Sequence, residues 1–156
     1  MGEINMDDEY QKLMKYFKNP KNVGIINNPD GYARVKNPIC GDLTDIYIKI
    51  EKNRIKQVKF KSFGCLVTIA SASALSKAVK DKNLDEIVET INPVETLIGL
   101  LMKEFGNLPR EKLHCPPAPV HALLLAISDY YKKSNRLDKL KKIDNVLSDI
   151  EKYYKK

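Results

Sequence analysis

The chain has 156 residues, 43% of them hydrophobic and 30% charged, which is the composition of an ordinary soluble domain. No apolar run reaches the roughly 20 residues needed to cross a bilayer, and the acidic start MGEINMDDEY lacks the character of a signal or transit peptide. We therefore expect a cytoplasmic protein with no membrane association, formed as a single domain over residues 1–156.

The net charge of +7 is concentrated at one end of the chain. Positions 132–156 hold nine Lys/Arg and four Asp/Glu, a surplus of 9 − 4 = +5. No helix-turn-helix pattern or aromatic RNA-binding signature accompanies this surplus. A solvated basic helix explains it, and we do not expect nucleic-acid binding.

The first half of the chain predicts one helix and a small sheet. Residues 7–18 form an amphipathic helix that ends at Asn19-Pro20; its apolar face is Tyr10, Leu13, Met14 and Phe17. The stretches 45–51 and 54–63 alternate apolar and polar residues around a two-residue link, which is typical of an antiparallel hairpin. The alternation slips near Gln57, and residues 32–36 supply a third strand.

The second half predicts helices. They cover residues 66–79, 84–90, 93–105, 117–133 and 137–154, the last with an apolar stripe of Leu140, Ile143, Leu147, Ile150 and Tyr154. Small residues in the first of these helices allow close packing on a sheet. Strands early and helices late indicate an α+β fold in two layers.

Each of the three cysteines lies at the end of a predicted element. Cys40 is in the turn NPICGD, Cys65 follows the second hairpin strand, and Cys115 precedes the helix at 117–133. Helix starts stabilise thiolates, the form of cysteine that binds metals, and an odd number of cysteines argues against a disulfide framework. Asp42 and His114 lie within two residues of Cys40 and Cys115.

Taken singly, each of these side chains has a plainer explanation. A lone cysteine is usually a small buried hydrophobe, Asp42 suits the cap of a turn, and His114 suits a half-exposed surface. Together, the five side chains favour a thiolate metal site at one edge of the sheet.

The order of these motifs resembles the IscU-type iron–sulfur cluster assembly scaffold, which also forms the N-terminal domain of NifU. The resemblance covers roughly residues 10–133 and rests on NPKNVG (19–24), NPICGD (37–42), the hairpin with its cysteine (46–65), IASASAL (69–75) and KLHC (112–115). It implies an IscU/SufE-like fold, in which helices pack on a three-stranded antiparallel sheet. The basic amphipathic helix at 134–156 lies beyond it as an extra C-terminal element.

The resemblance also implies a function, which is that of a scaffold and not of an enzyme. Cys40, Cys65 and Cys115 would hold a nascent [2Fe–2S] cluster, with Asp42 or His114 as the fourth ligand, and Zn²⁺ could occupy the same site. The implied partners are a cysteine desulfurase, ferredoxin or other donors of iron and electrons, and apo-protein acceptors. The sequence also permits a homo-oligomer that holds the cluster between subunits.

Two short stretches depart from the family pattern. The Gly-Ala-type pair after the second cysteine is here Leu66-Val67. The chaperone-recognition stretch LPPVK reads LPREK at 108–112, which predicts cluster transfer without help from an Hsp70-type chaperone.

Two other functions compete with the scaffold. The first is a SufU-type zinc-dependent sulfurtransfer protein that accepts persulfide from a cysteine desulfurase. That group carries a longer insertion before the third cysteine and lacks the adjacent histidine, so His114 favours the scaffold. The second is a small zinc-stabilised nucleic-acid binder, which the net charge permits but no motif supports.

Overall fold

The computed structural model describes residues 11–106 and 108–154. Its sheet has three antiparallel strands in the order β1 (Gly31–Lys36), β2 (Leu43–Glu51) and β3 (Arg54–Phe63). Lys52 and Asn53, with φ of 52° and 60°, form the two-residue turn between β2 and β3. Left-handed residues at both positions match the twist of a tight hairpin. The predicted α+β class and three-stranded sheet are confirmed.

The slip of alternation near Gln57 is a β-bulge. Gln57 pairs with Lys49 while Ile55 pairs with Ile50, so Lys56 is the extra residue of β3. The bulge re-sets the phase of the strand. As a result Ile55 and Val58, three positions apart, are both buried in the core.

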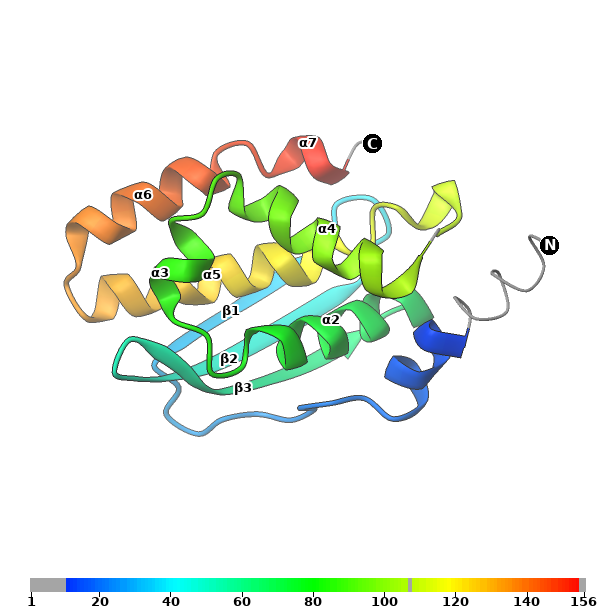
Figure 1. Cartoon of the computed structure of the whole chain (residues 1–156), viewed down its shortest axis with the longest axis horizontal. Helices are drawn as coiled ribbons and strands as arrows, with labels where there is room; N and C mark the ends of the chain where they lie inside the picture. The colour runs from blue at the N-terminus through cyan, green and yellow to red at the C-terminus, as the bar shows by residue number, and fades with distance from the viewer. Residues whose placement is uncertain (1–10, 107, 155–156) are drawn as a thin grey trace.

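The helices lie on one face of this sheet (Figure 1). In chain order they are α2 (Leu66–Val79), α3 (Leu84–Val88), α4 (Pro93–Phe105), the 3-10 turn η1 (Arg110–Lys112), α5 (Pro117–Lys133), α6 (Leu137–Leu147) and α7 (Glu151–Tyr154). α5 packs on β1 and β2, α2 packs on β3, α4 contacts both helices, and α6 runs along α5. Within the described part of the chain, no helix combines the length and apolar character that a membrane span requires.

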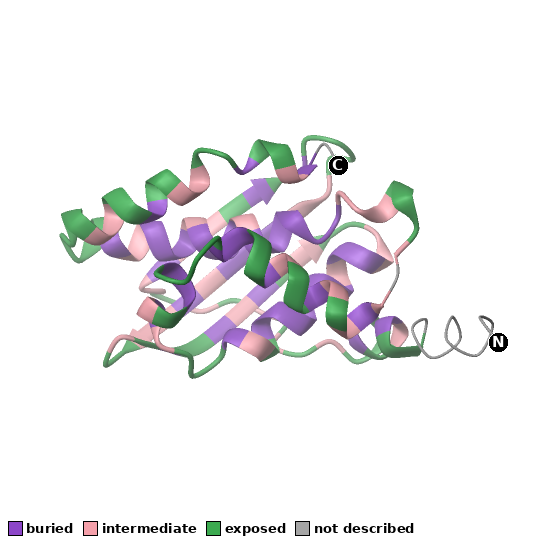
Figure 2. Cartoon of the chain, turned by 45° about the horizontal axis from the view of Figure 1, so that its top comes forward, coloured by how far each residue is buried: buried purple, intermediate pink, exposed green. Residues whose placement is uncertain are grey.

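The core lies between the sheet and these helices, where Figure 2 shows buried residues on the facing surfaces. The inward side chains of β2 and β3, such as Ile48 and Phe60, are at most 1% exposed. A Cβ added at Gly31 would lie 2.2 Å from the carbonyl oxygen of Ala126. Glycine therefore lets the start of β1 approach the backbone of α5.

On the opposite face of the sheet, one carboxylate is buried among polar partners. Asp45 is 3% exposed and accepts hydrogen bonds from Arg34 Nε at 2.7 Å and from the Tyr32 hydroxyl at 3.1 Å. The Arg34 guanidinium is the main cause that lowers the pKa of Asp45. This ion pair ties β1 to β2.

The N-terminal helix differs in one respect from the prediction. Residues 11–18 are helical and Leu13 is buried, but Phe17 is 37% exposed and Tyr16 is buried instead. Tyr16 packs edge-on against Phe105 and donates a hydrogen bond to Glu104 at 2.8 Å. The predicted residue Tyr10, like the rest of 7–10, lies outside the described residues.

Two helix boundaries also differ from the prediction. α3 ends at Val88 instead of residue 90, and the expected single helix over 137–154 is two helices, α6 and α7. The Ser148 hydroxyl donates to the Asn145 carbonyl at 2.7 Å, and the chain turns before α7 begins. The turn keeps Ile150 and Tyr154 buried.

Candidate metal centre

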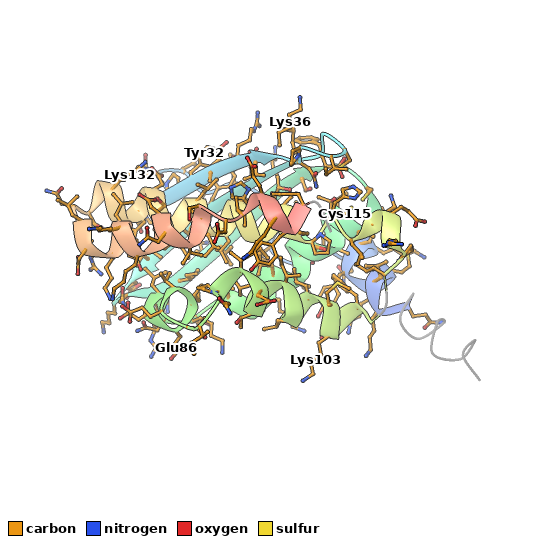
Figure 3. The ribbon with its side chains drawn as sticks, turned by 90° about the horizontal axis from the view of Figure 1, so that it is seen from above. Tyr32, Lys36, Glu86, Lys103, Cys115 and Lys132 are labelled. Atoms are coloured by element: carbon orange, nitrogen blue, oxygen red, sulfur yellow. The ribbon has the colours of Figure 1, made fainter. Side chains whose placement is uncertain are left out.

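Two of the three cysteines meet where two helices begin. Cys65 is the N-cap residue of α2, and Cys115 directly precedes Pro116, the N-cap of α5. Their sulfur atoms lie 3.5 Å apart. Cys115 is completely buried and Cys65 is partly buried; Figure 3 shows Cys115 at the end of the molecule where α5 begins.

The pKa values of the two thiols in this pair shift in opposite directions. A hydrogen bond from Cys115 is the main cause that lowers the pKa of Cys65 to about 5, and the Thr68 hydroxyl and the backbone at the start of α2 add to it. The same hydrogen bond, together with burial, raises the pKa of Cys115. The directions of these two pKa shifts favour Cys65 as the thiolate that is expected at a helix start.

Asp42 is held against Cys65 by two hydrogen bonds to one oxygen. Its Oδ2 accepts from the Cys65 amide at 3.1 Å and from the Thr68 hydroxyl at 2.9 Å. Burial opposes ionisation, but these donors hold the pKa of Asp42 below its ordinary value. A Cβ added at Gly64 would lie 2.4 Å from the Asp42 carboxyl group, so only glycine leaves room for the carboxylate here.

Cys40 lies on the exposed loop between β1 and β2. Asn37 closes this loop, since its amide donates to the Asp42 carbonyl at 2.8 Å and its carbonyl accepts from Gly41 at 2.9 Å. Although the residue is exposed overall, partial burial of its thiol and the charge of Asp42 raise the pKa of Cys40. The Cys40 thiol also hydrogen-bonds with Asp42 and is close enough to Cys65 to interact electrostatically.

His114 lies in the turn before α5, beside Cys115, and is partly buried. The Asn37 side chain donates to the His114 carbonyl oxygen at 2.9 Å, which joins the Cys40 loop to the Cys115 turn. The five predicted residues thus belong to adjoining segments. Across residues 11–106 and 108–154, however, no group of three or more Cys, His, Asp and Glu side chains is arranged to hold a metal ion as it stands.

Sequence reasoning missed the polar residues that hold this arrangement together. Thr68 is three positions after Cys65, a spacing that places two residues on one side of a helix. This spacing could have identified Thr68 as a neighbour of Cys65. Asn37 makes hydrogen bonds through its backbone and through both ends of its side-chain amide. It opens the motif NPICGD, but the motif does not indicate its contact with the His114 turn.

The C-terminal helix α7 also reaches this end of the molecule. The Tyr154 hydroxyl lies 2.9 Å from His121 Nδ1 in α5, and their rings meet edge-on. Tyr154 is 3% exposed. Burial and the nearby charge of Cys40 raise the pKa of its hydroxyl. In Figure 1, α7 lies close to the loop between β1 and β2.

A small sheet covered on one face by helices, with cysteines at three adjoining element ends, defines a known class of protein. The model of the NifU-like N-terminal domain family matches residues 8–137, and the chain belongs to this family. Residues 138–156, which include most of α6 and all of α7, lie beyond that match.

Curated relatives share most of their length with this chain. The iron–sulfur cluster assembly scaffold protein IscU 1 of Archaeoglobus fulgidus is 39% identical over 132 residues, which cover 85% of this chain and 82% of the relative. The iron–sulfur cluster assembly scaffold protein IscU of Aquifex aeolicus is 35% identical over 153 residues, 94% of this chain and 91% of the relative.

A solved structure shares the fold. It is a protein from Fervidobacterium islandicum described as an iron–sulfur cluster assembly scaffold for the SUF system. The TM-score is 0.61 at 24% identity, over 75% of this chain and 94% of that chain.

Proposed function

We propose that this protein is a scaffold on which [2Fe–2S] clusters are assembled and from which they pass to apo-proteins. The observation that carries the proposal is the contact of the Cys65 sulfur with that of Cys115, with Asp42 held beside them and Cys40 on an exposed loop. Membership of the NifU-like family and the names of the IscU relatives support it.

Cys40, Cys65 and Cys115 are the proposed thiolate ligands of the cluster, and Asp42 or His114 is the proposed fourth. Thiolates suit iron–sulfur clusters and zinc alike, so Zn²⁺ is expected to compete for the same residues. A carboxylate or imidazole in place of a fourth thiolate is a harder ligand and exchanges more readily. Such a ligand set suits a protein that must release its cargo.

The exposure of Cys40 gives the proposed partners access to the site. Sulfur delivered as persulfide by a cysteine desulfurase is at the oxidation level of S⁰, and each atom must gain two electrons to become sulfide. The chain itself therefore requires an outside electron donor, such as a ferredoxin, as well as a source of iron. The protein orients ligands and cargo and is not proposed to be an enzyme.

Anaerobic incubation of the apo-protein with Fe²⁺, cysteine, a desulfurase and a reductant tests this function. The expected result is a red-brown protein with the absorption of a [2Fe–2S] cluster, which is lost on Cys65→Ser. A matched control is Ser134→Ala, at the far end of α5, which should assemble the cluster as the native chain does.

The competing function is sulfur transfer by a zinc protein, which the exposed thiol of Cys40 would also permit. In that case the protein stays colourless, keeps its zinc, and gains about 32 Da as a cysteine persulfide in the mass spectrum. That outcome would replace the scaffold proposal.

A further inference from the structure

The hydroxyl of Thr68 lies between two of the proposed ligands. Its Oγ1 donates to Asp42 Oδ2 at 2.9 Å and lies 3.4 Å from Cys65 Sγ. Thr68 is completely buried, so water does not compete for these contacts. A buried hydroxyl is most favourable when it is hydrogen-bonded, and this one donates its single proton to Asp42.

We propose that Thr68 is a positioning residue of the metal centre, because its hydroxyl orients the Asp42 carboxylate toward the cargo while it contacts Cys65. This inference rests on the proposed function in one respect, which is that Asp42 serves as a ligand. Neither the family match nor the sequence motifs point to Thr68.

The geometry also indicates which oxygen of Asp42 meets the metal. Oδ2 already accepts hydrogen bonds from the Cys65 amide and from Thr68. Oδ1 is engaged by neither of these donors, and the Cys40 thiol that also interacts with Asp42 is itself a proposed ligand, so Oδ1 is the oxygen that the proposal assigns to the cargo. Hydrogen bonds to the other atom of a ligating group fix its orientation, and loss of such a partner typically weakens metal binding about 10–100-fold.

The rest of α2 shows that a buried hydroxyl in this helix does not always have such a role. Ser71 lies three residues further along the same helix and is completely buried. Its Oγ has no hydrogen-bond partner within the described part of the chain. Ser71→Ala therefore removes a buried hydroxyl from the same helix without removing a contact to a proposed ligand.

The test is the affinity of the metal-free protein for Co²⁺, followed by thiolate-to-cobalt absorption in competition with a chelator. Thr68→Val keeps the shape of the side chain and removes the hydroxyl, so it should bind Co²⁺ about 10–100-fold more weakly. Thr68→Ser should recover most of the native affinity, and Ser71→Ala should match the native protein. Thermal unfolding of each variant verifies that it is folded.

A double-mutant cycle separates positioning from a general loss of structure. In the Asp42→Ala background, Thr68→Val should change Co²⁺ affinity less than about threefold, since the carboxylate that it orients is gone. An equally large loss of Co²⁺ affinity in both backgrounds, or no loss in Thr68→Val by itself, would overturn this inference and leave the proposed function standing. Failure of the native protein to bind Co²⁺ through its cysteines would overturn the proposed function and this inference with it.

Discussion

The sulfur atoms of Cys65 and Cys115 lie 3.5 Å apart although fifty positions separate them in the sequence. Because a disulfide needs its two sulfurs at about 2.0 Å, only a small movement would join them. Treatment of the metal-free protein with diamide should form this disulfide, as the diamide takes up two electrons and two protons and becomes a hydrazine. Peptide mapping by mass spectrometry should find Cys65 linked to Cys115 and Cys40 free to be alkylated. A disulfide that contains Cys40 would contradict the arrangement.

Replacement of Gly64 should damage the metal centre more than the fold. In Gly64→Ala the new Cβ would meet the Asp42 carboxyl group at 2.4 Å, so the carboxylate must leave its position on Cys65 and Thr68. We expect Zn²⁺ affinity to fall by tenfold or more, in line with the loss of a ligand's orientation, while the thermal midpoint falls by only a few degrees. Gly99→Ala, in a position where an added Cβ meets nothing within 4 Å, is the matched control. Native zinc affinity in Gly64→Ala would show that Asp42 need not occupy its observed place.

Asp42 should matter more for release of the cluster than for its assembly. A carboxylate exchanges more readily than a thiolate, and Asp42, as a proposed ligand, would admit water to the iron when it dissociates. Asp42→Ala should therefore slow transfer to an apo-ferredoxin more than it slows assembly on the scaffold. Stopped-flow absorption resolves the two rates, and transfer at the native rate would exclude this role.

The ion pair on the open face of the sheet should make stability depend on pH. Arg34 lowers the pKa of Asp45 below the value of about 4 for an unfolded aspartate. The carboxylate therefore stabilises the fold fully above that value, and the stabilisation is lost as pH falls through the lower pKa of the folded state. Asp45→Asn should reduce the free energy of unfolding by about 1.5–3 kcal/mol at pH 7, the range for hydrogen bonds to a charged group.

Urea unfolding at a series of pH values measures this effect. The difference between native protein and Asp45→Asn should shrink below about pH 4. Glu51→Gln, at the exposed end of β2, should stay within about 0.5 kcal/mol of the native protein. A difference that does not change with pH would show that packing, not charge, is lost in Asp45→Asn.

The stretch LPREK should bind an Hsp70-type chaperone poorly. It forms an exposed 3-10 turn at Arg110–Lys112, so an extended groove would have to unwind it. Two charged residues also replace a rigid proline and an apolar valine of the family stretch. Since burial of a valine side chain is worth about 1.5–3 kcal/mol, we expect binding more than tenfold weaker than that of a peptide with LPPVK.

Fluorescence titration of two labelled peptides against an IscU-specific Hsp70 compares them directly. The native peptide spans 106–115, and its partner carries Arg110→Pro and Glu111→Val. Low-micromolar binding of the native peptide, lost on Lys112→Ala, would show that the altered stretch still functions.

The sequence predicted most of this fold because its signals are local. Alternation in β2 and β3, the two-residue turn between them and the proline-marked start of α5 each depend on neighbouring residues. Tyr16 and Phe17 are adjacent aromatic residues, by contrast, and only the packing of α4 against the first helix decides which is buried. The break at Ser148 likewise follows from the burial of Ile150 and Tyr154 in the tertiary structure.

The candidate site likewise has features that local sequence predicts and features that depend on tertiary contacts. The cysteines and Asp42 could be identified from their places at the ends of elements. The opposite pKa shifts of Cys65 and Cys115 could not, because they arise from a contact between helices that are far apart in sequence. The two hydrogen-bond donors to Asp42 Oδ2 come from the start of α2. They reach Asp42 only because the loop between β1 and β2 packs against this helix in the tertiary structure.

The order in which the chain is synthesised has a bearing on this site. Cys40 and Cys65 leave the ribosome well before Cys115, and α5, which covers β1 and β2, follows Cys115. Tyr154, whose hydroxyl meets His121 of α5, is made later still. Domains generally fold as units, so we expect a nascent chain to present Cys40 and Cys65 before Cys115 can join them. Iron or zinc captured at that stage would meet only two of the three proposed thiolate ligands, so we expect correct loading to follow the synthesis of Cys115 and the docking of α5.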